Sequence, residues 1–231
     1  MYKTIAIDGA CRRNGQPDCV SAGACFIHNA DETSWSCECH AASEEASTSQ
    51  RGELTGMLLA VEHVNHFPTE TVVITDSEYL FNSMTKCWVD RWMHNNWLTA
   101  QGDAVKNQDL WKAIWSFYVP IADNITFYHV KGHLLSIGVK KYHELVHKDS
   151  TGAELYKWAL NNKHIQPDKL QHAKELSKAN NGFVPEDDLI QQFAAMNLVA
   201  DVVANLCIET VEAEQWRQVL RNVSPTATVA L

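Results

Sequence analysis

The sequence predicts a mixed α/β fold, and two features of its hydrophobic pattern lead to that prediction. Three short strand-like runs come first, at residues 3–7, 21–28 and 33–40, and the turn residues between them favour an antiparallel meander. Helical and strand-like patterns then alternate along the chain, which is typical of parallel strands with helices between them. At 231 residues the chain can bury one good core with an added subdomain.

The elements after the meander are expected in the order helix, strand, helix, helix and strand. Their ranges are 50–66, 71–75, 77–86, 107–118 and 125–130. The first of these helices carries Leu54, Leu58 and Val61 at helical spacing. Pro68 ends it, because proline cannot continue a helix. A last amphipathic helix is expected from Met196 onward.

Composition and charge narrow the class of protein. The formal net charge of −9 argues against nucleic-acid binding through bulk electrostatics, so any such binding must be local. We find no charged-then-apolar leader and no apolar run near the roughly 18 residues of a membrane span. We therefore expect an intracellular protein, cytoplasmic or nuclear, without membrane contact. The seven cysteines lack paired metal-ligand spacing, and we interpret most of them as reduced thiols.

Three carboxylates occur where strand and helix ends can bring them together. Asp8 ends an apolar strand, Asp76 ends another, and Glu53 stands near the start of the helix at 50–66. Parallel strands would place Asp8 and Asp76 next to each other at one edge of the sheet. Such groups repel one another unless cations neutralise them, and oxygen ligands without His or Cys favour Mg²⁺, with Mn²⁺ as the substitute. Two ions about 4 Å apart suit phosphodiester hydrolysis.

Several short motifs follow one another along the chain. They are Asp8-Gly-Ala-Cys11 with Asn14-Gly15, Thr48-Ser-Gln50-Arg-Gly-Glu53, Thr75-Asp76-Ser77, Val130-Lys-Gly-His133, and a long stretch from Asn82 to Trp111. In this order they resemble the type 1 ribonuclease H family, enzymes that cut the RNA strand of RNA–DNA hybrids. The resemblance covers about residues 2–133 and 196–208.

The resemblance implies a ribonuclease H-like fold, which is a five-stranded mixed sheet flanked by helices. The ribonuclease H domain is then residues 1–222, and a helical insertion at about 139–194 interrupts it before the last helix. Residues 223–231 are expected to form a flexible tail. We expect a monomer whose insertion offers a surface for a protein partner.

The resemblance also implies the catalytic residues. Asp8 would lie between two Mg²⁺ ions, and Glu53, Asp76 and Asp201 would complete their ligand shells. His133 would sit on a mobile loop and act in proton transfer or product release, a role that suits an imidazole. Cleavage would leave a 5′-phosphate and a 3′-hydroxyl.

Substrate contacts follow from the resemblance in the same way. The RNA strand and its 2′-hydroxyls would be contacted by Cys11, Asn14 and Gln50. The DNA strand would be contacted by Thr48, Trp88 and Asn107. Asn197 completes the set of substrate residues.

The chain departs from the family in three places. The insertion separates His133 from Asn197, where relatives have a short loop, so it lies in the active-site loop itself. Ala46 stands where the family often places a basic residue of its DNA-phosphate pocket, and hybrid affinity is therefore expected to be lower. An added residue before Trp88 affects the register of that tryptophan.

Two segments allow more than one interpretation. The tryptophans at 88, 92 and 97 suit either a core or a projecting element that stacks on substrate. The basic run at Lys140, Lys141 and Lys148 suits either a solvated helix face or a nucleic-acid contact. We expect the insertion to contribute to substrate binding through these lysines. If the insertion only decorates the surface, replacement of residues 139–194 by a short linker is expected to preserve the fold and metal-dependent cleavage. If it binds substrate, the replacement is expected to weaken hybrid binding and flatten its salt dependence, while single-turnover cleavage at saturation survives.

Two other functions compete with hybrid cleavage. The insertion contains His143-Glu144-Leu-Val-His147, which matches the H-E-x-x-H pattern of zinc peptidases and would need a third ligand such as His164, His172 or Glu175. The match can also be accidental, or the two histidines can bind a structural zinc. The remaining alternative is a catalytically silent ribonuclease H-like binding module. An intact set of four acids argues against it, since a silent module has no need to crowd them together.

Overall fold

A five-stranded mixed sheet forms the centre of the molecule. The computed structural model describes residues 2–29, 35–42, 47–146, 152–162 and 165–223. The strands are β1 (Tyr2–Arg12), β2 (Val20–Asn29), β3 (Trp35–Ala41), β4 (Glu70–Thr75) and β5 (Ile125–His129), and they lie in the order β3-β2-β1-β4-β5. The first three strands pair antiparallel, whereas β4 pairs in parallel with β1 and with β5. The predicted meander and the predicted parallel pairing are both confirmed.

The strand register brings two of the acidic residues together. Ala6 lies opposite Ile74 in the parallel pair, so Asp8 and Asp76 each follow two residues later at the carboxyl end. One expectation is wrong, because Asp8 does not end its strand. The strand β1 continues beside β2 as far as Arg12, so Asp8 lies within a paired strand and its backbone is held by the sheet.

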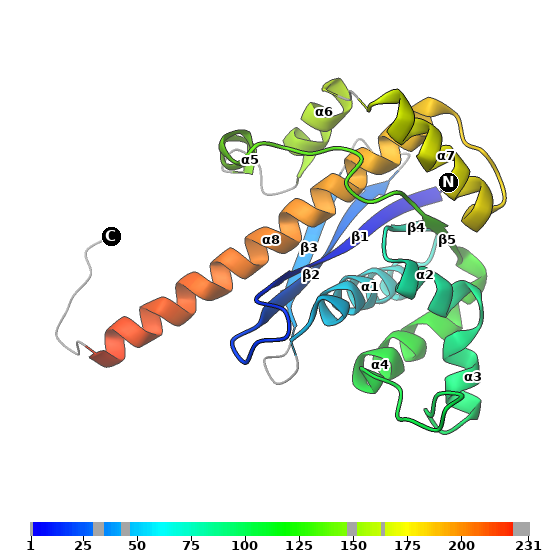
Figure 1. Cartoon of the computed structure of the whole chain (residues 1–231), viewed down its shortest axis with the longest axis horizontal. Helices are drawn as coiled ribbons and strands as arrows, with labels where there is room; N and C mark the ends of the chain where they lie inside the picture. The colour runs from blue at the N-terminus through cyan, green and yellow to red at the C-terminus, as the bar shows by residue number, and fades with distance from the viewer. Residues whose placement is uncertain (1, 30–34, 43–46, 147–151, 163–164, 224–231) are drawn as a thin grey trace.

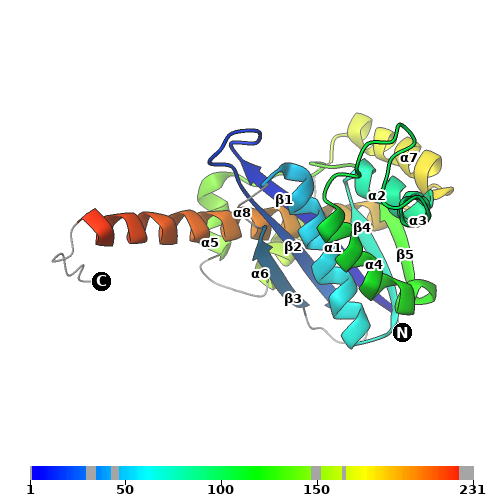
Figure 2. The same ribbon diagram turned by 90° about the horizontal axis from the view of Figure 1, so that it is seen from below.

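Helices cover both faces of the sheet (Figures 1 and 2). They are α1 (Ser49–His66), α2 (Glu78–Thr85), α3 (Trp88–His94), α4 (Gln108–Tyr118), α5 (Val139–Val146), α6 (Ala153–Asn161), α7 (Pro167–Asn181) and α8 (Asp187–Val223), with the 3-10 helix η2 (Val119–Asn124) before β5. On one face, Leu54 and Val61 of α1 are buried in a cluster with Ile5. On the other face, Val199 of α8 is buried in a cluster with Phe26. Alternate residues of each strand therefore serve two separate cores.

Side-chain caps fix where the two helices nearest the acidic residues begin. The Thr48 hydroxyl accepts a hydrogen bond of 3.2 Å from the backbone N–H of Arg51, and α1 starts directly after Thr48. The Ser77 hydroxyl accepts one of 3.4 Å from Leu80 at the start of α2. Each cap satisfies a backbone donor that the first helical turn leaves without a partner. Both helices begin within one residue of the predicted positions.

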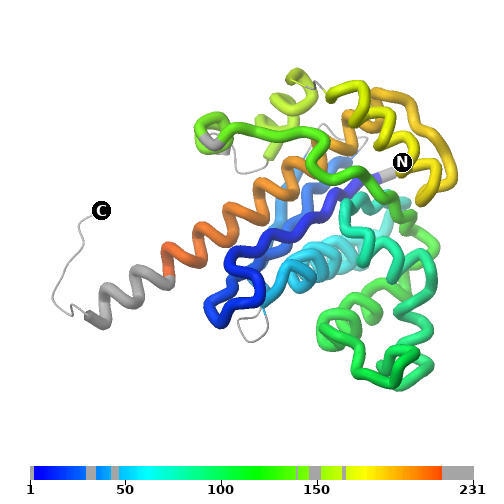
Figure 3. Tube along the Cα trace, viewed as in Figure 1, coloured from blue at the N-terminus to red at the C-terminus, as the bar shows by residue number. Residues whose placement is uncertain are grey.

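The inserted helices α5, α6 and α7 gather around the first part of α8 (Figures 1 and 3). They contribute to the core, because Leu155, Tyr156 and Ala159 of α6 are buried in the same cluster as Phe26 and Ile74 of the sheet. A short linker in place of residues 139–194 would uncover that cluster. The insertion is therefore more than surface decoration, and we expect such a replacement to lower the stability of the fold.

The last helix begins earlier than the sequence predicts. It starts at Asp187 and not at Met196, so the predicted insertion boundary at residue 194 falls inside it. Part of this helix, Asp187–Glu214, is long and apolar enough by composition to cross a membrane, with a mean hydropathy of 1.4, contrary to the expectation from the sequence. In the fold, 56% of that apolar window is buried inside the protein, where it packs on the sheet. The apolar composition is therefore accounted for by the core.

The tryptophan-rich segment forms α3 and the turns that follow it. Trp92 meets the buried Trp111 of α4 edge to face, with ring centroids 5.7 Å apart, and Trp97 packs against the same cluster. Trp88 is half-buried, and its ring lies 6.3 Å from that of Trp92. The core interpretation is thus confirmed for Trp92 and Trp97, while Trp88 keeps part of its surface exposed at the end of the molecule formed by α3 and α4 (Figure 1).

Candidate active site

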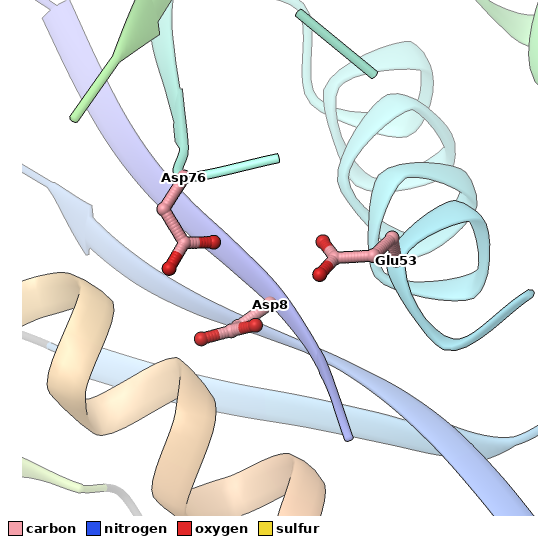
Figure 4. A group of neighbouring side chains, drawn as sticks. All are labelled: Asp8, Glu53 and Asp76. Atoms are coloured by element: carbon pink, nitrogen blue, oxygen red, sulfur yellow. The ribbon is translucent and has the colours of Figure 1, made fainter. Parts of the chain in front are cut away.

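Three carboxylates from three different elements point toward one another (Figure 4). Asp8 comes from β1, Glu53 from the second turn of α1, and Asp76 from the residue after β4. One oxygen of each lies within 4.8 Å of the others. The convergence predicted from the sequence is confirmed, and these are the oxygen ligands that a divalent cation needs.

Glycines allow α1 to approach the sheet closely enough for this convergence. A Cβ atom added at Gly9 would collide with the backbone nitrogen of Glu53, and one added at Gly23 would collide with the backbone of Gly56. Gly52 in turn lies against the carbonyl oxygen of Ala22. With no side chains between helix and strands, the start of α1 rests directly on β1 and β2. Glu53 can therefore reach the oxygens of Asp8.

Burial and mutual repulsion both disfavour the ionised form of this cluster. Burial, followed by the charges of Asp76, Glu53 and Asp201, raises the pKa of Asp8 well above its ordinary value, although the backbone N–H of Gly9 donates a 2.7 Å hydrogen bond to it. Burial and the charges of Asp76 and Asp201 likewise raise the pKa of Glu53. A bound cation would therefore stabilise the ionised carboxylates at neutral pH.

A fourth carboxylate, Asp201, stands at the edge of the cluster on α8. Burial is the largest cause that raises the pKa of Asp201, and the charge of Asp76 adds to it, whereas His133 acts in the opposite direction. Asn205, one turn further along α8, donates a hydrogen bond of 2.9 Å to the Oδ1 atom of Asp201. His133 is exposed on the loop after β5, and it lines a small cavity together with Asn197 and Asp201. The fold thus brings His133 and Asp201 together across the insertion.

Asp76 is held in place by residues on two sides. The side-chain amide of Asn197, which is buried in α8, donates a hydrogen bond of 3.3 Å to the Oδ2 atom of Asp76. On the loop after β5, Gly132 lies so close that an added Cβ atom would press on the same carboxylate. Asn197, which the resemblance assigns to the substrate, therefore contacts a carboxylate of the acidic cluster directly.

The residues present fit a divalent metal. The Oε2 atom of Glu53 is buried and has no hydrogen-bond partner among the described residues, and the same holds for the Oδ1 atom of Asn197. An ionised oxygen left in this state is costly unless a cation accepts its lone pairs. Asp8, Glu53 and Asp76 would hold such an ion, with Asp201 beside them, and all of these donors are hard oxygens that suit Mg²⁺ or Mn²⁺.

The residues that the resemblance assigns to the RNA strand come from β1, from the turn after it and from the first turn of α1. Cys11 lies on β1 three residues beyond Asp8, and burial followed by the contact with Cys19, whose Sγ atom is 3.2 Å away, raises the pKa of its thiol to about 12. Asn14 lies in the turn between β1 and β2 and donates a hydrogen bond of 3.4 Å to the hydroxyl of Ser49. Gln50 is exposed in the first turn of α1. These residues form one group beside the start of α1.

Thr48 and Asn107 form a second group. Arg51, which the sequence did not identify as a site residue, lies beside them. Arg51 is buried, and its guanidinium contacts both carboxylate oxygens of Asp109, at 2.9 and 2.6 Å, and the side-chain oxygen of Asn107 at 3.4 Å. It lies one turn from Thr48 in the motif quoted above. The signal that the sequence offers for this role is the place of Arg51 inside the motif from Thr48 to Glu53.

Parts of four predictions lie outside the described residues. The residues concerned are Ala46, His147, Lys148, His164 and 224–231 of the predicted tail. In the described part of the H-E-x-x-H motif, Glu144 lies on α5 and contacts Lys141 at 3.2 Å, and the ring of His143 packs against Tyr142. The described contacts therefore place Glu144 beside a lysine on an exposed helix face.

The class of protein that this sheet and this acidic cluster define is a metal-dependent nuclease. A family model described as RNase H matches residues 2–150, which is more than half of the chain. The chain therefore belongs to the ribonuclease H family, and it is a ribonuclease enzyme. The matched segment contains Asp8, Glu53, Asp76 and His133, whereas Asp201 follows the insertion.

Curated relatives agree with the family match. The chain is 36% identical over 130 residues to a ribonuclease H of Chlorobium phaeobacteroides, which is 56% of this chain and 82% of the relative. It is 34% identical over 135 residues to that of Chlorobaculum parvum, covering 58% and 86%. A ribonuclease H of Moorella thermoacetica is 33% identical over 130 residues, covering 56% and 79%. Each match spans most of the relative and somewhat more than half of this chain.

Solved structures that resemble the chain are more distant. The RNase H domain of PFV covers 67% of this chain and 94% of its own, with a TM-score of 0.47 and 18% identity. LC9-RNase H1, described as a type 1 RNase H with the type 2 active-site motif, covers 78% and 84%, with a TM-score of 0.46 and 20% identity. The family match and the sheet order give the chain its ribonuclease H fold.

Proposed function

We propose that this enzyme hydrolyses the RNA strand of RNA–DNA hybrids with two Mg²⁺ ions and leaves 5′-phosphate and 3′-hydroxyl ends. The observation that carries the proposal is the convergence of Asp8, Glu53 and Asp76, whose oxygens lie within 4.8 Å of one another in a chain of the ribonuclease H family. Mn²⁺ is the expected substitute, because it accepts the same oxygen donors.

Each carboxylate has a distinct part in the proposal. Asp8 is the most buried of the three acids, and its oxygen lies within 4.8 Å of those of both Glu53 and Asp76, which suits a ligand shared by two ions. Asp201 stands next to Asp76 on the side of α8 and completes the set. When bound, the ions supply an activated water and stabilise the charge that develops on the phosphate. Without the ions, the charges of the four acids would only repel one another.

His133 is proposed to move protons near the scissile phosphate. It is exposed on the loop after β5, where its imidazole can reach solvent, and it lies close enough to Asp201 to stabilise that carboxylate. An imidazole changes charge near neutral pH, which suits a group that protonates a leaving oxygen or helps product leave.

Recognition of a hybrid requires contacts to both strands. Cys11, Asn14 and Gln50, beside the acidic cluster, are proposed to contact the RNA strand, where the 2′-hydroxyl distinguishes RNA from DNA. The DNA strand would lie along Thr48, Trp88 and Asn107. Arg51 supports this second group because it contacts Asn107 and follows the Thr48 cap.

A cleavage assay tests the proposal directly. A hybrid with a labelled RNA strand is incubated with the protein in Mg²⁺, beside single-stranded RNA, duplex RNA, duplex DNA and casein. We expect Mg²⁺-dependent cleavage of the hybrid alone, with products that a 5′-phosphate-dependent exonuclease degrades. Equal cleavage of duplex RNA, or activity that chelator does not remove, would contradict the proposal.

A further inference from the structure

We infer that the inserted helix α7 takes part in the active site, because Asn180 orients the ring of His129 and His129 in turn positions Asp76. The inference rests on the proposed role of Asp76 as a metal ligand. Asn180 and His129 are positioning residues in this scheme, since neither reaches the acidic oxygens. Neither belongs to the motifs that identify the family.

The ring of His129 lies between Asp76 and the insertion. His129 is the last residue of β5 and is 5% exposed. Its Nε2 atom is 3.2 Å from the backbone carbonyl oxygen of Asp76, and its Nδ1 atom is 2.6 Å from the side-chain nitrogen of Asn180. Phe81 of α2 stacks on one face of the ring, with centroids 5.3 Å apart and planes 24° from parallel. The ring is therefore held at both nitrogens and on one face.

The chemistry of the two contacts fixes the tautomer of the neutral ring. A carbonyl oxygen can only accept, so the Nε2 atom that faces Asp76 must carry the proton. The Nδ1 atom then has a lone pair, and the amide nitrogen of Asn180 can only donate to it. The two contacts are consistent with each other in this one arrangement. The amide of Asn180 thus orients the N–H of His129 toward Asp76.

The helix that carries Asn180 is fixed to the same strand. The side-chain oxygen of Asn181 accepts a 2.9 Å hydrogen bond from the backbone N–H of His129, and its side-chain nitrogen donates one of 3.0 Å to the carbonyl oxygen. Because β5 is an edge strand, these backbone groups have no neighbouring strand to pair with on that side. The amide of Asn181 takes the place of that strand, and the Ser177 hydroxyl lies 2.6 Å from the hydroxyl of Tyr128.

Asp76 is consequently held at both ends. Its backbone oxygen contacts the ring of His129, and its Oδ2 atom accepts a hydrogen bond from Asn197. Partners of this kind, which orient a metal ligand without touching the metal, commonly change metal affinity by ten- to a hundredfold when they are removed. The insertion therefore serves the site through the contact of Asn180 with His129, as well as through the core.

The test compares four variants with the wild-type chain. Asn180→Ala removes the donor to the ring. His129→Leu removes the ring, and His129→Gln restores an N–H donor of similar reach as a rescue. Asn161→Ala changes an exposed asparagine of α6 and serves as the matched control. Mg²⁺ affinity is measured by calorimetry without substrate, kinetics are measured on the hybrid, and ¹⁵N NMR of labelled histidine identifies which ring nitrogen of His129 carries the proton.

We expect the wild-type ring to carry its proton on Nε2. Asn180→Ala and His129→Leu should weaken Mg²⁺ affinity on the order of tenfold and lower kcat at limiting Mg²⁺ with the KM for hybrid unchanged. His129→Gln should recover most of the affinity, and Asn161→Ala should equal the wild type. A proton on Nδ1 in the wild type, or unchanged Mg²⁺ affinity in Asn180→Ala, would overturn the inference. Normal Mg²⁺ binding without hybrid cleavage would instead contradict the proposed function alone.

Discussion

The guanidinium of Arg51 joins α1 to α4 through both of its terminal nitrogens, which contact the two carboxylate oxygens of Asp109 at 2.9 and 2.6 Å. The side chain of Arg51 is 6% exposed and that of Asp109 is 62% exposed, so a buried cation is paired with an acid at the surface. This pairing lowers the pKa of Asp109. It also fixes the guanidinium beside Asn107, in the group proposed to meet the DNA strand.

We predict that Arg51→Lys raises the KM for hybrid several-fold and leaves kcat nearly unchanged. A lysine cannot make the planar two-point contact, so Asn107 loses its support while the acidic cluster is untouched. The loss of charge-assisted hydrogen bonds should also lower the free energy of unfolding by about 2 kcal/mol. Steady-state kinetics and urea unfolding provide the measurements. A large fall in kcat at unchanged KM would show that Arg51 acts on the chemical step instead.

Removal of charge from the acidic cluster should abolish cleavage and stabilise the fold. Asp8→Asn and Asp76→Asn each keep the shape of the side chain but remove the charge that binds cations. Without metal, the free energy of unfolding of Asp8→Asn should exceed that of the wild type by about 1 kcal/mol or more at neutral pH. Hybrid cleavage and urea unfolding in chelator are the measurements. A variant with near wild-type activity in Mg²⁺ would remove these residues from the metal site.

The stabilisation by Asp8→Asn should depend on pH in a defined direction. Burial and the neighbouring acids raise the pKa of Asp8 in the folded state above its unfolded value. The ionised form is then disfavoured by folding, so the wild type loses stability as pH rises through the raised pKa and regains it below the ordinary carboxyl range. The stability difference between the variant and the wild type should therefore close as pH falls. A difference that widens toward low pH would contradict this account.

Gly9→Ala should separate Glu53 from Asp8. The added Cβ atom would collide with the backbone nitrogen of Glu53, and backbone cannot swing aside as a side chain can. We expect a loss of about 2 kcal/mol or more in unfolding free energy and much weaker Mg²⁺ binding. Thermal unfolding with and without Mg²⁺ measures both effects. Gly138→Ala is the matched control, because no atom lies within 4 Å of its added Cβ, and it should change neither.

The peptidase motif should be dispensable. Glu144→Gln removes the carboxylate that a zinc peptidase would use as its base, and in the structure it weakens an exposed ion pair with Lys141. We expect hybrid cleavage and its metal dependence to stay unchanged, with a stability effect within about 0.5 kcal/mol. Casein hydrolysis with added Zn²⁺ is measured in parallel. Peptidase activity in the wild type that disappears in the variant would restore the rival function.

The basic run of the insertion is still predicted to contribute to hybrid binding. Simultaneous substitution of Lys140, Lys141 and Lys148 by Ala should weaken hybrid binding and reduce its salt slope by about one for each lysine that contacts a phosphate. The contact between Lys141 and Glu144 at 3.2 Å must open or be shared for Lys141 to take part. Binding is followed by fluorescence anisotropy over a range of salt. Unchanged affinity and slope would leave the lysines as a solvated face.

The sequence predicts the sheet and its acidic cluster because both depend on local signals. Apolar runs with turn residues between them locate the strands, and an acid beside each of two parallel strands has only one edge at which to meet its partner. The end of β1 could not be predicted from such local signals. Residues beyond Asp8 pair with β2 as far as Arg12, although their small and polar side chains give no strand pattern. The C-terminal end of β1 is set by its pairing with β2.

The insertion shows why the remaining features could not be predicted. Its polar composition suggests a surface element, yet Leu155 and Tyr156 lie in the core beside Phe26. A few apolar residues among many polar ones are enough to form part of a core when three helices pack around a fourth. The contact of Asn180 with His129 spans 51 positions and depends on where α7 docks, which no local pattern contains.

The glycine contacts between α1 and the sheet divide the acidic site into two parts of unequal rigidity. Asp8 and Glu53 stand on backbones that touch directly, so their spacing can change only if a helix lifts away from two strands. Asp201 is carried by α8, which meets the cluster through the side chain of Asn197. His133 is carried by the loop after β5, whose Gly132 lies against the Asp76 carboxylate, a side chain that can move. Local opening costs least where few buried contacts must break. Ions and products should therefore enter and leave past Asp201 and His133, while the other half of the site stands still.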